Sequence, residues 1–213
     1  MANGLPPALS SQATLDVEPD TNPNSAFWQS APHLIFEGGI YGNKIPGHST
    51  EVRSRWTENN LYFLFRCPYQ ELHLKPDPDT SAKTSGLWNW DVAEAFIGST
   101  GDPMHRYKEF ELSPQTEWLD LDINLENADK VNDHFWSSGF QVAAHIATKE
   151  KTWYGCMRIP YAAIENSKAV AGNTLRINFF RSQGPKPLEL AWRPPMQESF
   201  HAPEQFGLLR LIR

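Results

Sequence analysis

The chain has 213 residues, enough to bury a sizeable core as one large β domain or two small ones. Its formal net charge is −6, which argues against a nucleic-acid-binding protein because such proteins need a basic surface. It has no apolar run of about 18 residues, so no membrane-spanning segment or membrane partner is predicted.

Residues 1–29 are rich in Pro, Ser, Asn and Ala and are predicted to wrap over the surface of a single domain spanning residues 30–213. They lack the basic start and apolar stretch of a signal peptide, so these residues by themselves favour a cytoplasmic protein.

The first clear strand ends at Trp56, and the turn at residues 57–60 leads into a second strand at residues 61–67. Asn59 and Asn60 tolerate the positive φ of a tight hairpin, so we expect that conformation here. Residues 68–90 contain Pro, Asp, Ser, Thr and Gly and are predicted to form a long irregular loop. Loops of this length in a compact domain are usually functional or mobile.

Further strands follow in the second half of the chain. Residues 118–125 alternate polar and apolar side chains, which is typical of a half-buried strand. A short helix or turn is predicted after Pro160, at Tyr161–Ile164. The other expected strands are Val92–Gly98, Phe140–Ala147, Trp153–Ile159, Leu175–Arg181 and a final apolar strand near residues 207–211. Many short strands with almost no helical period predict an all-β, antiparallel two-sheet β-sandwich of jelly-roll type, with under about 15% helix against a typical third.

Cys67 and Cys156 both lie in apolar, strand-like segments. Buried free thiols are the simpler interpretation, and a single core disulfide is the alternative.

Two loops concentrate aromatic residues. One contains Trp88 and Trp90, and the other runs from Trp192 through three prolines and Phe200 into the last strand. Aromatic side chains on loops stiffened by proline are available to stack on a ligand. In an acidic protein this favours a flat, polar ligand, of which a sugar ring is the leading example.

The order of the motifs points to a family. The motifs are Trp56…Asn60-Leu61-Tyr62, Trp88-x-x-Asp91-x-x-Glu94-x-Phe96-Ile97, Phe110-Glu111-Leu112-Ser113-Pro114, Arg158-Ile159-Pro160, Ile177-Asn178-Phe179-Phe180-Arg181, and Trp192…Phe200-x-x-Pro203-x-x-Phe206-Gly207-x-Leu209-Arg210-Leu211. In this order they resemble the family 9 carbohydrate-binding modules that accompany xylanases, which have a DOMON-like β-sandwich. The resemblance covers roughly residues 30–213.

The resemblance implies a non-catalytic module in which Trp88 and Phe200 clamp a sugar ring from opposite faces. It implies that Glu94 accepts hydrogen bonds from sugar hydroxyls and that Gln197 contributes an amide. The family places an arginine near Glu111, and this chain has none there, so Arg106 is the candidate substitute. Trp90, Asp91 and Glu111 complete the expected ligand-binding residues.

The resemblance also implies a partner and a setting. The partner is a plant-type polysaccharide or oligosaccharide such as xylan, bound by a monomer. Relatives of this type are secreted or periplasmic, which differs from the cytoplasmic expectation drawn from the first residues. A structural calcium ion is the one cofactor that the resemblance suggests.

Each site residue also has a structural interpretation. Trp88 and Trp90 would then cover the edge of the sandwich, Phe200 would fill the core, and Glu94 would pair with an arginine. The polar residues of one strand, Asp120, Asp122 and Asn124, resemble metal ligands in type, although a solvated stripe is expected because hard-cation sites usually gather oxygens from loops.

Function classes other than sugar binding have weaker support in the sequence. No nucleophile elbow or metal-binding histidine spacing is present, so no enzyme is predicted; a glycosidase would need two placed carboxylates, such as Glu94 with Asp91 or Glu111. Met104 and His105 could serve as axial ligands only in a non-covalent haem domain, and a colourless protein is expected. A structural or interaction module with a degenerate sugar site is the main alternative.

Overall fold

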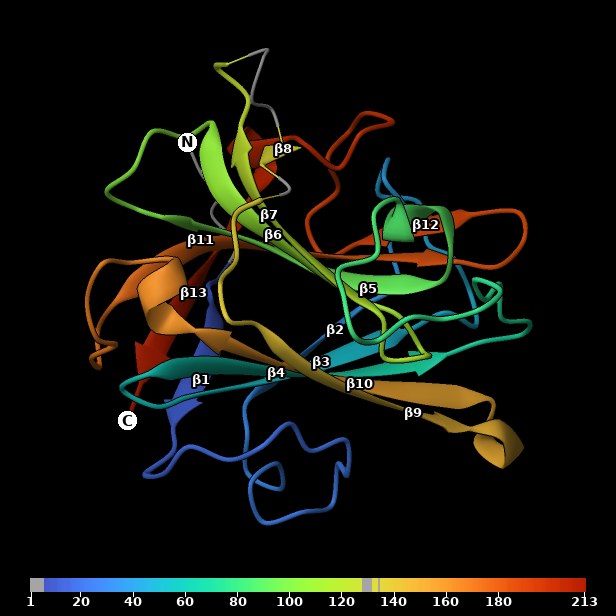
Figure 1. Cartoon of the computed structure of the whole chain (residues 1–213), viewed down its shortest axis with the longest axis horizontal. Helices are drawn as coiled ribbons and strands as arrows, with labels where there is room; N and C mark the ends of the chain where they lie inside the picture. The colour runs from blue at the N-terminus through green and yellow to red at the C-terminus, as the bar shows by residue number, and fades with distance from the viewer. Residues whose placement is uncertain (1–5, 128–131, 134) are drawn as a thin grey trace.

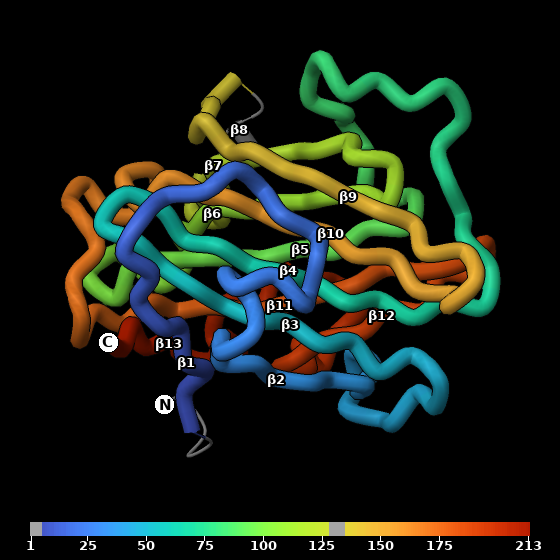
Figure 2. Tube along the Cα trace, turned by 90° about the horizontal axis from the view of Figure 1, so that it is seen from below, coloured from blue at the N-terminus to red at the C-terminus, as the bar shows by residue number. Residues whose placement is uncertain are grey.

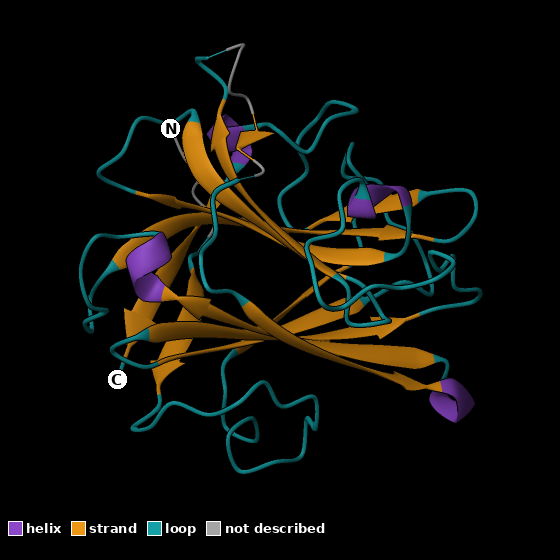
Figure 3. Ribbon diagram, in the orientation of Figure 1, coloured by secondary structure: helices purple, strands orange, loops and turns teal. Residues whose placement is uncertain are grey.

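The computed structural model describes residues 6–127, 132–133 and 135–213, and its regular secondary structure is almost entirely strand (Figure 3). Strands make up 43% and helix 6% of the structure, which confirms the predicted all-β fold with little helix. The described strands are β1 (Ala8–Gln12), β2 (His33–Phe36), β3 (Thr50–Trp56), β4 (Asn60–Pro68), β5 (Val92–Ser99), β6 (Arg106–Leu112), β7 (Trp118–Asn124), β8 (Asn132–Asp133), β9 (Gln141–Ala147), β10 (Thr152–Pro160), β11 (Thr174–Gln183), β12 (Leu188–Ala191) and β13 (Gly207–Ile212).

The strands form two facing layers (Figure 1). The first layer has the order β8-β7-β6-β5-β11-β13, with β12 also paired to β11, and the second has the order β3-β4-β10-β9, with β2 paired to β3. Strand β1 joins the layers, because it pairs in parallel with β13 on one side and with β3 on the other. The sandwich is therefore antiparallel within each layer, and the two parallel pairings lie where the layers meet.

Alternation along each strand determines what fills the space between the layers. On β5 the inward side chains are Ala93, Ala95 and Ile97, and they belong to the same buried cluster as Phe63 and Phe65 of β4. The intervening residues of β5 point to the outer face of the first layer, since successive side chains on a strand point to opposite faces.

The outer face of the second layer is covered by the segment that follows β1, residues 13–32, which crosses β4 and β10 (Figure 2). Trp28 is fully buried there and packs in one cluster with Tyr62 and Cys156. The surface-wrapping segment expected at residues 1–29 thus includes an unpredicted strand, β1, whose hydrogen-bonding partners lie far away in the sequence. Residues 1–5 fall outside the described part of the chain.

The hairpin between β3 and β4 has the predicted position, and the amide of Thr57 donates to the carbonyl of Asn60. The expected positive φ at Asn59 or Asn60 is wrong, because neither residue has one. The turn is closed by the Thr57 hydroxyl, which accepts from the amides of Asn59 and Asn60.

Three further expectations concern the remaining elements. The helix after Pro160 is a single 3-10 turn at Tyr161–Ala163. Cys67 and Cys156 are buried free thiols, and the disulfide alternative is excluded because they face opposite sides of the second layer. Within the described residues, no helix is long and apolar enough to cross a membrane.

Candidate functional site

A cleft of about 180 Å³ opens on the outer face of the first layer, over β5, β6 and β11. This is below the range of about 300–1,000 Å³ for sites that hold drug-sized ligands, so it suits a single ring better than an extended ligand. The residues that line it are Trp88, Glu94, Phe96, Glu109, Ser182, Glu189, Glu198, Phe200 and His201.

Trp88 reaches the cleft from a tight turn immediately before β5. Gly86 has φ 74°, a left-handed conformation that suits glycine, and it begins the 3-10 turn Leu87–Asn89. Leu87 is fully buried and anchors this turn, whereas the side chain of Trp88 is 42% exposed. The turn therefore presents one large aromatic ring to solvent beside the cleft.

Phe200 comes from the proline-rich loop that precedes β13. Its ring stacks on that of Phe180 of β11, with the ring centroids 4.3 Å apart and the planes within 11° of parallel. One face of Phe200 is thus covered by the sheet. The ring is both a packing residue of the loop and a wall of the cleft, so the two interpretations of this residue are compatible.

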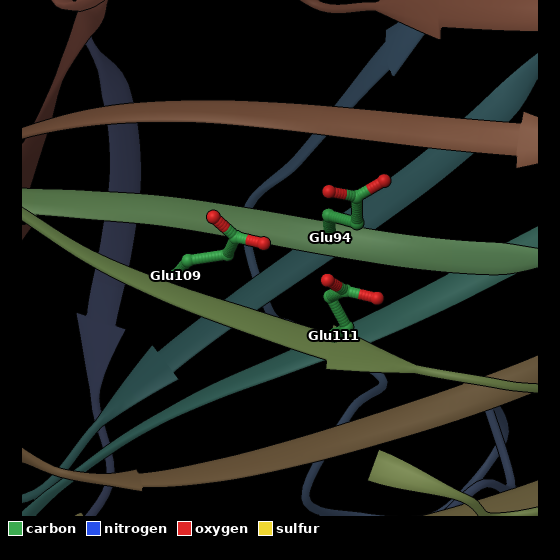
Figure 4. A group of neighbouring side chains, drawn as sticks. All are labelled: Glu94, Glu109 and Glu111. Carbon is green, nitrogen blue, oxygen red and sulfur yellow. The ribbon is translucent and has the colours of Figure 1, made fainter. Parts of the chain in front are cut away.

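Glu94, Glu109 and Glu111 lie on neighbouring strands at the base of the site (Figure 4). Glu94 of β5 is directly opposite Glu111 of β6, and Glu109 follows Glu111 at the same-face spacing of two residues. Carboxylate oxygens from the three residues all lie within 4.8 Å of one another. Like charges placed opposite each other destabilise a sheet, so this arrangement needs an explanation other than stability.

Burial and mutual repulsion shift the titration of all three groups. Burial, followed by the nearby Glu109 and Glu189, raises the pKa of Glu94 well above its ordinary value. Burial raises the pKa of Glu109 to about 7. Burial, together with Glu94 and Glu109, raises the pKa of Glu111 well above its ordinary value. The cluster therefore holds protons, or another positive charge, near neutral pH.

His201 was not foreseen as part of the site. Its Nδ1 lies 2.5 Å from the hydroxyl of Tyr107, its Nε2 lies 3.9 Å from Glu109 Oε2, and its ring stacks on Phe96. Burial lowers the pKa of His201, which favours a neutral ring.

Two predicted residues beside Trp88 do not line the cleft. Trp90 stacks on His73, with ring centroids 4.5 Å apart. Asp91 is buried and accepts a 2.5 Å hydrogen bond from the amide of Gly184. Both residues therefore fasten the long loop and the turn after β11 next to the start of β5.

Gln197 and Arg106 are also placed away from the expected contacts. The Gln197 amide donates at 3.3 Å to the carbonyls of Ser199 and His201, and the neighbouring Glu198 lines the cleft instead. Arg106 lines a separate hollow, on the face of β6 opposite that of Glu109 and Glu111. The expectation that it replaces the missing family arginine is wrong, because strand alternation directs its side chain away from the cleft.

The structural alternative for Glu94, a pair with an arginine, is also wrong. Arg181 of β11 faces the opposite side of the sheet, where it donates to Thr50 Oγ1 and to the carbonyl of Pro68. In the described part of the chain, Glu94 forms no ion pair, and its Oε1 is buried without a hydrogen-bond donor.

The expected solvated stripe on β7 is wrong for Asp120 only, since Asp122 and Asn124 are partly exposed. Asp120 is fully buried and forms an ion pair with Lys83 at 2.6 Å, and Asp122 pairs with Lys108 at the same distance. Their strand is a half-buried one as predicted, but its apolar residues face outward into the cluster beside the cleft. The polar residues instead meet lysines at the edge of the inner face.

Met104 and His105 lie in the turn between β5 and β6. Met104 is half exposed, and His105 Nδ1 lies 3.8 Å from Glu126. This places both residues at the opposite end of β5 from Trp88.

The fold, the two loop aromatics and the cleft on the outer sheet face define a ligand-binding β-sandwich. The family model described as "Carbohydrate family 9 binding domain-like" matches residues 20–213, so the chain belongs to that family.

Similar solved structures share the fold over nearly the whole chain. A Bacteroides uniformis protein described as a candidate carbohydrate-binding protein has a TM-score of 0.76 at 17% identity, covering 95% of this chain and 97% of its own. A family 9 module from Caldicellulosiruptor kristjanssonii in complex with cellotriose has a TM-score of 0.67 at 13% identity, covering 97% and 94%. The corresponding glucose complex has a TM-score of 0.66 at 13% identity, covering 96% of both chains.

Two relatives found by sequence share different fractions of their own length with this chain. Endo-1,4-beta-xylanase A of Thermotoga neapolitana is 22% identical over 187 residues, which are 87% of this chain but only 16% of the xylanase. An extracellular protein of Arthroderma benhamiae is 26% identical over 170 residues, covering 73% of this chain and 75% of that protein. The chain therefore spans about a sixth of the xylanase that it matches.

Proposed function

We propose that this chain is a non-catalytic carbohydrate-binding module that holds one sugar ring in the cleft between Trp88 and Phe200. The observation that carries the proposal is the convergence of these two loop aromatics and the buried carboxylate of Glu94 on one cleft. Membership of the family supports it, as do the cellotriose and glucose complexes of structural neighbours.

The chemistry of the cleft suits a pyranose. The C–H groups of a sugar ring present an apolar, slightly positive face that packs on the negative face of an aromatic ring. Sugar hydroxyls donate hydrogen bonds to carboxylates, and such charge-assisted bonds are stronger than neutral ones. The cleft offers Glu94, Glu109, Glu189 and Glu198 as acceptors.

A catalytic role does not fit the same carboxylates. Glycosidases place two carboxyl groups on either side of a scissile bond. Glu94 and Glu111 instead stand side by side on adjacent strands of one sheet face. Glu94 and Glu111 would therefore contact one side of a ligand and do not form such a flanking pair.

The expected affinity is weak, in the range of about 0.1–1 mM. The cleft is small, so few atoms are desolvated on binding. Its described lining residues include no lysine or arginine that would donate to ring or hydroxyl oxygens.

The test is isothermal titration calorimetry of the full chain with glucose, cellotriose and xylotriose. Replacing Trp88 by Ala removes a stacking face and is expected to cost about 1–3 kcal/mol of binding, roughly a 5- to 150-fold loss of affinity. Trp90→Ala is the matched control: Trp90 stacks on His73 outside the cleft, so its loss should leave binding within twofold.

The second candidate function is an interaction module with a degenerate sugar site. The observation that favours it is the stacking of Phe200 on Phe180, which leaves one ring face for a ligand. If no sugar in the panel gives a calorimetric signal at several millimolar, this second function replaces the first.

The proposal also covers the oligomeric state, the location and the polysaccharide partner. We infer a monomer that acts outside the cytoplasm on plant-type polysaccharide such as xylan or cellulose. The support is the similarity to an extracellular fungal protein and to one part of a much longer xylanase.

A further inference from the structure

The three glutamates at the base of the cleft lack the partners that buried carboxylates normally have. Glu94 and Glu109 line the cleft and are 2% and 4% exposed. Glu94 Oε1 and Glu109 Oε2 have no hydrogen-bond donor. Buried charges are normally paired or coordinate a metal, so two such atoms side by side require a positive partner.

Glu111 gives a second observation that points to a ligand. It is fully buried, and neither of its carboxylate oxygens has a hydrogen-bond donor from outside the glutamate cluster. Its side chain lies on the same side of the sheet as those of Glu94 and Glu109 (Figure 4), and one oxygen from each of the three lies within 4.8 Å of the others. A surface acidic stripe would keep its oxygens in water, whereas these oxygens are enclosed and face one another.

No protein cation neutralises the cluster within the described residues. Lys108 and Arg181 lie on the opposite face of the sheet, where they contact Asp122 and the carbonyl of Pro68. The imidazole of His201 lies 3.9 Å from Glu109, and its Nδ1 is already engaged by the hydroxyl of Tyr107 at 2.5 Å.

We propose that Glu94, Glu109 and Glu111 bind a hard divalent cation, with Ca²⁺ as the best fit. Calcium takes six to eight oxygen ligands at about 2.3–2.6 Å, so oxygens around one ion lie at most about 5.2 Å apart. The spacing of 4.8 Å or less meets that limit. An all-carboxylate set favours Ca²⁺, Mg²⁺ or Mn²⁺ over softer metals, and calcium tolerates irregular geometry best.

The position of the ion gives it a role in the cleft. Glu94 and Glu109 line the same cleft as Trp88 and Phe200, so the coordination positions that the protein leaves open would face the ligand space. If the proposed function holds, two neighbouring sugar hydroxyls complete the coordination sphere there. The cation then supplies the positive charge that the cleft lacks.

The first experiment uses the full chain treated with EDTA and dialysed into metal-free buffer at pH 7.5. Titration with CaCl₂, followed by calorimetry and by thermal unfolding, should show saturable binding of one ion and a rise in Tm. Glu111→Gln should weaken Ca²⁺ binding at least tenfold while the circular dichroism spectrum is retained. Glu58→Gln, in the exposed turn between β3 and β4 and outside the cleft, is the matched control and should change it less than twofold.

Glu94→Gln is a second variant in case Glu111→Gln does not fold, and it should weaken Ca²⁺ binding to a similar degree. The proposal is overturned if Ca²⁺, Mg²⁺ and Mn²⁺ all fail to bind at 1:1 stoichiometry up to about 10 mM, a concentration beyond that of weak extracellular sites. It is also overturned if binding is unchanged in the folded glutamine variants. The carboxylates then share protons only.

Sugar titrations with and without Ca²⁺ separate this proposal from the proposed function. Sugar binding without any metal binding overturns the cation site and leaves the carbohydrate-binding module intact. Metal binding that depends on Glu111 supports the cation site even if no sugar binds, in which case the proposed function fails alone. Sugar binding that rises at least tenfold on adding Ca²⁺ supports both.

Discussion

The outer faces of the two layers differ in what covers them. The outer face of β4 and β10 is sealed by residues 13–32, with Trp28 fully buried against it. Arg55 holds this covering segment by donating to the carbonyl of Phe27. The outer face of β5 and β6 stays open as a cleft beside the exposed Trp88. One sheet uses its second face for stability, and the other leaves it available to a ligand.

Carboxylates show the same contrast. Asp16, in the covering segment, accepts hydrogen bonds from Thr57, Asn59, Asn60 and Tyr62. Partial burial raises its pKa, but these hydrogen bonds outweigh burial and lower it to about 2. Glu111, buried beneath the cleft, has no hydrogen-bond donor from outside the glutamate cluster among the described residues. In the covering segment the chain itself supplies the hydrogen-bond donors of the carboxylate, whereas at the cleft a ligand would have to supply a partner.

The largest expected effect is on the free energy of unfolding, and it distinguishes Trp28 from Trp88. Trp28→Ala should lower the free energy of unfolding by about 3–5 kcal/mol, because it removes a fully buried ring from the covering segment. Trp88→Ala should change it by less than about 1 kcal/mol, because Trp88 is 42% exposed and lies outside the core. Urea unfolding of both variants measures the difference. Similar losses would mean that the cleft aromatic is structural.

The next effect is the pH dependence of stability in EDTA, where the glutamate cluster has only protons to neutralise it. The folded protein binds those protons more tightly than the unfolded chain, since the pKa of Glu109 rises from its ordinary value of 4.5 to about 7. Its contribution is full below pH 4.5 and is lost as the pH rises through 7. Stability should therefore fall by on the order of 1 kcal/mol per pH unit across that window.

Glu111→Gln is the variant that tests this dependence. It removes one acid from the cluster and should flatten the decline, making the variant more stable than the parent at pH 8. Urea midpoints at pH 5, 6, 7 and 8 give the comparison. A parent protein whose stability is level from pH 5 to 8 would show that the cluster is not protonated in the folded state.

The smallest effect concerns Asp16. Asp16→Ala should cost about 1–2 kcal/mol at pH 7, because the four donors lose a charged acceptor at a partly exposed site. The lowered pKa gives the opposite sign to the glutamates: this stability is present above the ordinary value of 3.8 and is lost as the pH falls through about 2. Glu18→Ala is the control. Its partner Arg158 forms only a solvent-exposed ion pair with it, so a change within about 0.5 kcal/mol is expected.

The strands were predictable because their signals are local. Alternation over residues 118–125 and the apolar runs around Leu61 and Trp153 locate β7, β4 and β10. The face that each side chain takes was less predictable: Asp120 is buried because Lys83, distant in sequence, meets it there. Strand β1 was missed for a similar reason, since its partners lie in β3 and β13.

The residues of the candidate site also differ in how far the sequence could predict them. The family motifs bring Trp88, Glu94 and Phe200 to attention, and the structure places all three at one cleft. Glu109 precedes Glu111 by the same-face spacing of two residues, but β6 was not among the predicted strands, so this signal was missed. Glu189 reaches the cleft only through the pairing of β12 with β11, which one sequence does not reveal.

The parallel junction has a consequence for how the chain folds. Ala8 pairs with Leu209, and Trp56 Nε1 donates to the carbonyl of Ile212, so the seam that joins the two layers requires both ends of the chain. Contacts of such large sequence separation form slowly, because the entropy of closing the loop must be lost before they stabilise anything. The two layers can each pair their antiparallel strands early, but the sandwich cannot close at this seam until residues 207–212 have left the ribosome.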